Sequence, residues 1–279
     1  MYILLKKVFS LMSLYRIILS IPGCEHALAK KSVLVTGLSG VIGGAVLKNL
    51  REKYDLVALN RREVPGVPCH RADIADLEAI SSAFEGKDAV VHLAAVLGNA
   101  SWDDTLRTNL IGTYNVFEAS RRASVKRVIF ASSGAVQTGY ENEYPINAIV
   151  KAQYDKVPPR WSTITVEAPT RPIDLYGASK VWGEALARYY SEAHGLSAIC
   201  LRFGRVTPED RPMVPRDYAV YCSLRDAAQM VDKCLSAPDS LRFDTFYVVS
   251  NNKWRFRDID HAREVVGYMP LDGVGSYNG

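Results

Sequence analysis

From Ser32 onward, the sequence alternates short runs of β-branched residues with longer amphipathic segments. The first three are "SVLVTG", "GVIGGAVLKNLREK" and "YDLVALN", which predict a strand, a helix and a second strand. Later runs such as "AVVHLAA" and "RVIFA" are apolar without alternation, as in strands that are covered on both faces. The order therefore predicts an α/β fold of the Rossmann type, a doubly wound and mostly parallel sheet with helices on each side.

After the first 30 residues, the chain is expected to have two domains. Residues 31–204 form the Rossmann dinucleotide-binding domain, and residues 205–279 form a small C-terminal substrate-binding cap with two helices and a strand between them. A stretch near 140–170 interrupts the alternation of strands and helices, because residues 139–172 contain five of the 13 prolines and show no sustained periodicity. It predicts an insertion at a strand end, where long loops often carry function.

The first 30 residues combine early positive charge, apolar runs and a small-residue "ALA" segment, which is also the outline of a secretory signal. Arg16 divides the apolar run, and neither side reaches the roughly 18–20 residues that a bilayer span needs. We favour an atypical or wrongly assigned extension, with Met12 as a candidate start, over a targeting segment. No membrane partner is predicted.

Composition argues against several classes of function. A formal net charge of +4, without a run of five like charges, argues against a nucleic-acid partner. Five scattered cysteines form no C-x-x-C pair, so neither a metal site nor a disulfide framework is predicted. A reducing, cytoplasmic compartment and a small-molecule substrate fit these properties best.

The segment "TGLSGVIGG" lies between the first strand and the first helix. Its first glycine permits a tight turn, its second lets the backbone approach a pyrophosphate, and its third allows the helix to pack closely on the strand. The helix N-terminus then faces the phosphates. The motif predicts a dinucleotide held by Gly37, Ser39, Gly40, Val41, Ile42 and Gly43.

The end of the second strand should face the ribose of the adenosine half. An acidic side chain there would bind a 2′-hydroxyl, whereas an arginine would suit a 2′-phosphate. The strand ends in Asn60, Arg61 and Arg62, with no acid. This favours NADP over NAD. The alternative is that both arginines are solvated loop charges.

The stretch "DLYGASKVWGEAL" puts Tyr176 four residues before Lys180 at a predicted helix start. On one helix face, the ammonium group can lower the tyrosine pKa from its usual value of roughly 10 and bind the nicotinamide ribose. Tyr2 and Lys6 have the same spacing, so the spacing alone proves little. What distinguishes the later pair is Ser133 of "IFASSGAV", at the carboxyl end of a strand, where ligands bind in open α/β sheets.

Six segments, "TGLSGVIG", "HLAA", "TNLIGTYNVFEA", "FASS", "YGASK" and "AREVVGYMP", resemble the extended short-chain dehydrogenase/reductase family in its own order, and uronate dehydrogenases in particular. The resemblance covers nearly all of residues 32–271. It implies that Ser133 hydrogen-bonds the reacting oxygen, Tyr176 is the acid/base and Lys180 assists it. It also implies that Asn109 supports a proton relay. The further cofactor contacts that we predict are Asn60, Arg61, Asp73, Ile74, Leu93, Ala94, Ala95, Asn109, Tyr176 and Lys180.

Two departures from uronate dehydrogenases concern the substrate. In those enzymes an asparagine that touches the sugar follows the active serine, and here that residue is Gly134. A serine contact after the "R-x-G" strand is replaced by Arg205. Arg202, Arg205 and Arg211 could clamp a carboxylate, since guanidinium groups suit planar acids, or could be solvated loop charges. Our predicted substrate contacts are Ser133, Gly134, Arg205 and Arg211.

The favoured function is an NAD(P)-dependent oxidoreductase that moves hydride between the nicotinamide and a carbinol or hemiacetal carbon of a free sugar or sugar acid. A sugar-nucleotide epimerase or dehydratase is the alternative, although the chain after residue 204 is short for binding a nucleoside diphosphate. A third hypothesis is a protein that senses the dinucleotide without turnover. The resemblance also implies a homodimer, formed through the helices predicted in 105–123 and 181–193.

Overall fold

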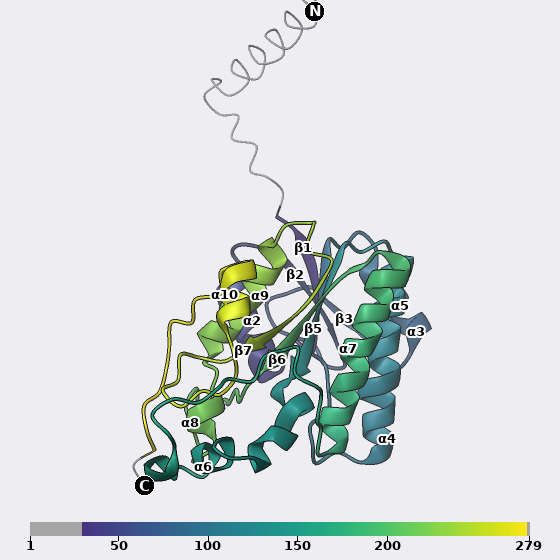
Figure 1. Cartoon of the computed structure of the whole chain (residues 1–279). Coiled ribbons are helices and arrows are strands. Elements are labelled where there is room, and N and C mark those ends of the chain that lie inside the picture. The colour runs from purple at the N-terminus through teal and green to yellow at the C-terminus, as the bar shows by residue number, and fades with distance from the viewer. Residues whose placement is uncertain (1–29, 278–279) are drawn as a thin grey trace, which may run out of the picture. The chain divides into compact units, whose positions relative to one another are not determined.

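The computed structural model describes residues 30–277, so the predicted extension lies outside the described residues except for Lys30. Seven parallel strands form one sheet in the order β3-β2-β1-β4-β5-β6-β7 (Figure 1). The predicted doubly wound parallel sheet is confirmed. The strands are β1 (Ser32–Thr36), β2 (Asp55–Asn60), β3 (Cys69–Arg71), β4 (Ala89–His92), β5 (Arg127–Ser133), β6 (Ser197–Phe203) and β7 (Phe243–Val248).

Helices cover both faces of the sheet (Figure 1). One face packs against α2 (Val41–Leu50), α9 (Leu224–Ser236) and α10 (Asp260–Val266), and the other against α3 (Leu77–Ser81), α5 (Thr113–Arg122) and α7 (Leu175–His194). The side chains of successive strand residues point to opposite faces of the sheet and pack in two separate hydrophobic cores. In β1, Val33 and Val35 face the first layer and Leu34 the second. Both sides of each central strand are therefore apolar, which is why these runs do not alternate in the sequence.

The direction of winding reverses beside β1. That strand pairs with β2 on one side and with β4 on the other. The connections that leave the carboxyl ends of β1 and β4 therefore diverge, and a crevice opens between them. The glycine turn after β1 lies at this point of the sheet.

The helix predicted over "DDTLRTNLIGTYNVFEASRRA" is built from three segments in direct succession. They are α4 (Trp102–Asp104), the π-helix η2 (Thr105–Gly112) and α5. A β-carbon at Gly112 would lie 2.6 Å from the side chain of Ile74, so the missing side chain allows this close packing. The wide π-turns place Asn109, which is buried, towards the loop after β4.

The C-terminal part differs from the expected cap, because most of its regular structure belongs to the main sheet. β7 pairs with β6, while α9 and α10 pack in the same layer as α2. Phe246, Tyr247 and Val248 are fully buried, which a strand in a small separate cap would not achieve. The loops on either side of α8 (Asp217–Val220) and the segment after β7 remain at the carboxyl edge of the sheet.

The expected insertion near 140–170 lies at the same edge and contains two short helices, α6 (Ile146–Val150) and η4 (Tyr154–Lys156). The helix η3 (Gly134–Asn142) leads into it from β5, and η1 (Ser82–Phe84) follows α3 elsewhere in the fold. The insertion is tied to the C-terminal segment by a parallel bridge between Ile164 and Arg257. Among the residues that the structure describes, no helix has the length and apolar character to cross a membrane.

Candidate active site

Two adjoining hollows lie at the carboxyl edge of the sheet. The Arg61 cavity, of about 340 Å³, lies at the ends of β1, β2 and β3. The Tyr176 cavity, of about 660 Å³, lies at the ends of β4, β5 and β6. Both are lined by the glycine turn and by the loop after β4, so an elongated ligand could extend from one into the other. The residues they share are Gly37, Gly40, Leu93 and Ala95.

The turn after β1 has the geometry of an anion cradle. Gly37 has a φ of +71°, and a β-carbon there would lie 2.7 Å from the Ala94 nitrogen. A β-carbon on Gly43 would lie 2.6 Å from the carbonyl oxygen of Gly37. Gly40 precedes α2 in an extended conformation, and no side chain caps the helix, so the N–H groups of its first turn remain available to a ligand. These features fit the pyrophosphate of a dinucleotide.

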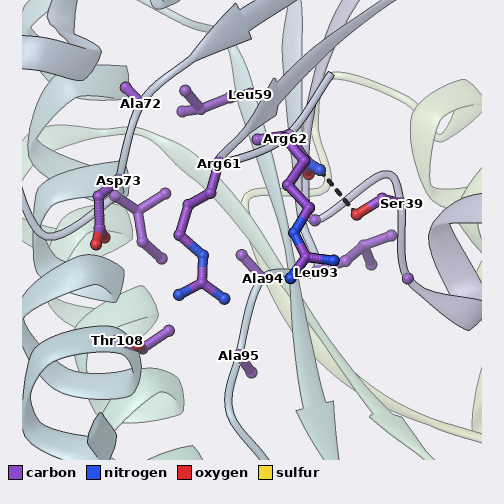
Figure 2. A pocket seen from close by; sticks show the side chains of 14 residues that line it. Ser39, Leu59, Arg61, Arg62, Ala72, Asp73, Leu93, Ala94, Ala95 and Thr108 are labelled. Carbon is purple, nitrogen blue, oxygen red and sulfur yellow. Dashed lines mark hydrogen bonds between the residues drawn. The ribbon is translucent and has the colours of Figure 1, made fainter. Parts of the chain in front are cut away.

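Arginines dominate one wall of the Arg61 cavity. The side chains of Arg61 and Arg62 extend from the end of β2 into the cavity, towards the loop that carries Ala95 (Figure 2). The Asn60 amide donates a 2.8 Å hydrogen bond to the Ser39 hydroxyl, which joins the end of β2 to the glycine turn (Figure 2). A ligand here would meet two guanidinium groups.

The opposite wall of this cavity contains Asp73 (Figure 2), and Ile74 is among the residues that line the cavity. The Asp73 carboxylate is already engaged, because it accepts hydrogen bonds from the Ala75 backbone and, at 3.1 Å, from the Arg107 guanidinium. Burial opposes its ionisation, but these two donors and the charge of Arg61 lower its pKa overall. The acid of this wall is thus tied to the protein, whereas Arg61 remains directed at the cavity.

His92, which was not among the predicted site residues, holds the loop after β4 in place. Its ring is fully buried and lies 2.7 Å from the Thr36 hydroxyl through Nδ1 and 3.1 Å from the Thr113 hydroxyl through Nε2. The Thr36 hydroxyl accepts a hydrogen bond from the Ala94 N–H. Burial, aided by the charge of Lys180, lowers the pKa of His92 to about 3, so the ring is neutral. A histidine at a strand end is the only sequence signal for this role.

Three of the predicted catalytic side chains line the Tyr176 cavity together. Ser133 ends β5, while Tyr176 and Lys180 lie on α7. Asp174, two residues before the tyrosine, caps this helix by accepting a 2.6 Å hydrogen bond from the Gly177 N–H, so the helix begins at Leu175. The chain therefore brings together a hydroxyl, a phenol and an ammonium group from two elements.

Lys180 is held in place by the end of β5. Its Nζ donates a 2.8 Å hydrogen bond to the Ala131 carbonyl and lies 5.5 Å from the centroid of the Tyr176 ring. Burial lowers the pKa of Lys180 to about 8, although the charge of Glu184 opposes this. Burial raises the pKa of Tyr176, while a hydrogen bond from Ser133 acts in the opposite direction. Both groups are thus shifted towards their uncharged forms.

Asn109 lines neither cavity. Its side chain exchanges two hydrogen bonds with the backbone of Val96, at 2.9 and 3.0 Å, and donates a third to the Ser179 hydroxyl at 3.0 Å. It therefore ties the loop after β4 to α7, next to Lys180. The predicted proton relay stays a prediction.

The arginines that we considered for substrate binding lie in three places. Arg202 is buried, and its guanidinium donates to both carboxylate oxygens of Glu184, at 2.8 and 2.9 Å. Arg211 lines a separate hollow between α2 and the C-terminal segment. Arg205 lines the Tyr176 cavity, as do Arg216 and Arg257, which were not among the predicted substrate contacts. The residues that the structure describes contain no cluster of His, Cys, Asp and Glu suited to a metal ion.

Comparisons with known proteins agree with this geometry. Residues 33–216 match the NAD dependent epimerase/dehydratase family. The NAD-dependent glucose-6-phosphate dehydrogenase of Haloferax volcanii is 32% identical over 88% of this chain and 95% of its own length. The uronate dehydrogenase of Pseudomonas syringae pv. tomato is 30% identical over 86% of this chain and 82% of its own.

The structural comparison leads to the same group. A mutant uronate dehydrogenase from Agrobacterium tumefaciens, solved in complex with NAD, superimposes with a TM-score of 0.74 and 28% identity, over 88% of this chain and 86% of that one. The predicted resemblance to sugar and uronate dehydrogenases is thereby confirmed. On these grounds the chain belongs to the NAD dependent epimerase/dehydratase family.

Proposed function

We propose that this protein is an NAD(P)-dependent dehydrogenase that oxidises a free sugar or sugar acid, or reduces the corresponding carbonyl compound. The observation that carries the proposal is the meeting of Ser133, Tyr176 and Lys180 in a cavity that adjoins the glycine turn. The dehydrogenase activities in the names of the similar proteins support it.

Each side chain has a defined role in this proposal. The Ser133 hydroxyl hydrogen-bonds the reacting oxygen of the substrate and orients it. The Tyr176 phenolate removes the hydroxyl proton, and Lys180 stabilises that phenolate by its charge. The nicotinamide, when bound, supplies the hydride acceptor or donor. In the reductive direction, Tyr176 returns the proton to the carbonyl oxygen.

The cofactor contacts follow from the two cavities. We propose that the glycine turn binds the pyrophosphate, that the loop Leu93–Ala95 lines the nicotinamide ribose, and that Asn109 fixes this loop by its bonds to Val96. We also propose a preference for NADP, because Arg61 and Arg62 extend into the Arg61 cavity and could pair with a 2′-phosphate.

Two wider features belong to the proposal. The C-terminal loops and the segment after β7 would bind the substrate, since Arg205, Arg216 and Arg257 line the Tyr176 cavity. A homodimer would form on α5 and α7, where the large apolar side chains of Tyr114 and Trp182 are exposed. A cytoplasmic location is part of the same proposal, as the expected site of a dinucleotide-dependent enzyme.

The alternative is a sugar-nucleotide epimerase, which would use the same tyrosine and lysine. It is less favoured because such an enzyme must also bind a nucleoside diphosphate, whereas much of the C-terminal part of this chain serves the main sheet. The three relatives reported above are all named as dehydrogenases.

The test is the appearance of reduced nicotinamide in absorbance assays of the purified full chain. NADP and NAD would each be supplied with uronic acids, aldoses, aldose phosphates and simple alcohols. Reduction that depends on a free sugar or sugar acid would establish the function. If none of these compounds supports cofactor reduction and the protein interconverts a sugar nucleotide, the epimerase function would replace the dehydrogenase function.

A further inference from the structure

The guanidinium group of Arg257 takes the place of a side chain beside Ser133. A β-carbon added to Gly134 would collide with Nη1, Cζ and Nη2 of Arg257. The guanidinium therefore lies where the side chain of any other residue at position 134 would begin. Its Nη2 donates a 3.1 Å hydrogen bond to the Gly134 carbonyl, and the residue lines the Tyr176 cavity although it is only 2% exposed.

The charges around Arg257 are unbalanced. Glu141 is buried and accepts two hydrogen bonds from the Arg216 guanidinium, at 2.5 and 2.6 Å, but only one, at 3.4 Å, from Arg257. One carboxylate thus serves two guanidinium groups, both of which line the cavity. Arg205 also lines the cavity and lies 4.0 Å from the buried Asp217, so three guanidinium groups face two carboxylates on this side, a net charge of +1. Buried charges are normally paired, so an anion bound here would complete the arrangement.

Two distant segments hold Arg257 rigidly. The insertion pairs with the segment that carries it, since the Ile164 N–H donates to the Phe256 carbonyl at 2.7 Å and the Asp258 N–H donates to the Ile164 carbonyl at 2.9 Å. Trp254 stacks between Tyr154 and Trp161 of the insertion, with ring centroids at 4.2 and 5.4 Å. A side chain fixed in this way loses little conformational freedom when a ligand binds.

We propose that Arg257 determines substrate specificity by binding an anionic oxygen group of the sugar, a carboxylate or a phosphate, while Ser133 and Tyr176 hold the reacting carbon. The inference rests on the proposed dehydrogenase function of the same site. Guanidinium groups recognise both anions by charge-assisted hydrogen bonds. The insertion thereby acts on specificity, because it supplies Glu141 and positions the segment of Arg257.

The experiment compares the full chain with Arg257→Gln, Arg257→Lys and Gly134→Ala. The values of kcat/KM are measured with glucuronate, glucose 6-phosphate and glucose as probes. Arg255→Gln is the matched control, since it removes the same charge from the same segment and its guanidinium bonds Asn251. Thermal unfolding of each variant, with and without NADP, reports whether the fold and the cofactor site are intact.

We expect the wild-type chain to prefer one of the two anionic sugars over glucose, and the better one tells a carboxylate site from a phosphate site. In Arg257→Gln the ratio of kcat/KM for that sugar over glucose falls by about 10- to 100-fold, the range for a lost charged hydrogen bond. Gly134→Ala lowers the ratio too, because the new methyl group displaces the guanidinium. Arg257→Lys retains part of the preference, and Arg255→Gln retains it all.

Two results would overturn the inference. One is a wild-type preference for glucose, and the other is an equal loss of activity on all three sugars in Arg257→Gln. If the wild-type chain turns over no sugar, the proposed function fails. The role of Arg257 is then tested separately, by calorimetric titration of the NADP-loaded protein with each of the two anionic sugars. Binding that weakens at least tenfold in Arg257→Gln supports it, and the lack of any such difference refutes it.

Discussion

The hydroxyl of Ser132 donates a 2.6 Å hydrogen bond to Oε1 of Glu184, one helical turn beyond Lys180. The same carboxylate receives both hydrogen bonds from the buried Arg202 guanidinium. Arg202 in turn donates to the Gln137 amide oxygen at 3.0 Å. One buried polar network behind the cavity therefore joins the ends of β5 and β6 to α7 and η3.

Loss of the Glu184 carboxylate should destabilise the fold. We expect Glu184→Ala to lower the free energy of unfolding by about 3–5 kcal/mol, because it leaves the buried Arg202 charge unpaired. Urea unfolding would measure this. The control is Glu192→Ala on the same helix, whose exposed pair with Arg188 should contribute less than about 1 kcal/mol. Equal effects of the two substitutions would contradict the importance of the network.

Removal of the proposed acid/base should abolish most of the turnover. We expect Tyr176→Phe to reduce kcat by about 100- to 10,000-fold, since the proton acceptor is lost, while cofactor binding persists. Steady-state assays and fluorescence titration with the cofactor separate these two effects. Tyr189→Phe, at an exposed position of the same helix, is the control. Turnover within a few-fold of wild type in Tyr176→Phe would remove this residue from the mechanism.

The choice of cofactor should depend on Arg61. We expect Arg61→Ala to weaken NADP binding by about 10- to 100-fold, because a charged hydrogen bond to the 2′-phosphate is lost, and to change NAD binding far less. Calorimetric titration with each dinucleotide measures both affinities. Arg188→Ala, far from the cavity, should change neither. Parallel losses for NADP and NAD would mean that Arg61 does not read the 2′-position.

The buried His92 should make the fold sensitive to mild acid. Its pKa is about 3 in the folded chain and roughly 6.5 when unfolded, so only the unfolded chain gains a proton as the pH falls below 6.5. The stability that neutral His92 provides is present above that value and is lost as the pH falls towards 3. Between pH 6 and 5 the free energy of unfolding should fall by about 1.2 kcal/mol on its account.

Urea titrations at several pH values, on the wild-type chain and on His92→Asn, would test this. The variant should show a flatter pH dependence over that window, even if it is less stable throughout. His194→Asn, at an exposed ring, should keep the wild-type slope. An identical slope in wild type and His92→Asn would show that the imidazole titrates normally in the folded chain.

The proposed homodimer should depend on the exposed face of α5 and α7. We expect Trp182→Glu to convert a dimer to a monomer, because a charge would then be buried among apolar side chains of the partner. Sedimentation velocity measures the change, and Leu271→Glu, at another exposed apolar residue, is the control. A wild-type chain that sediments as a monomer at all concentrations would exclude the interface.

Features with a short sequence spacing could be predicted from the sequence. The strand–turn–helix around Gly37, the i, i+4 relation of Tyr176 and Lys180, and Ser133 at a strand end each depend on contacts within a few residues or within one element. The parallel sheet with helices on both faces follows from the apolar runs that do not alternate. These features were predicted because local hydrogen bonding and hydrophobic periodicity decide them.

Tertiary structure alone decided which charges are paired and which face the cavity. From the sequence, Arg202 was as good a candidate for substrate binding as Arg205, yet its guanidinium is hydrogen-bonded to both carboxylate oxygens of Glu184. Arg257 hydrogen-bonds the Gly134 carbonyl although it lies 123 residues further along the chain. The insertion that holds its segment in place has no periodicity in the sequence. β7 joins the sheet although its segment suggested a cap. The cost of burying a charge or an unpaired backbone depends on which distant segments pack around it, and spacing along the chain does not contain that information.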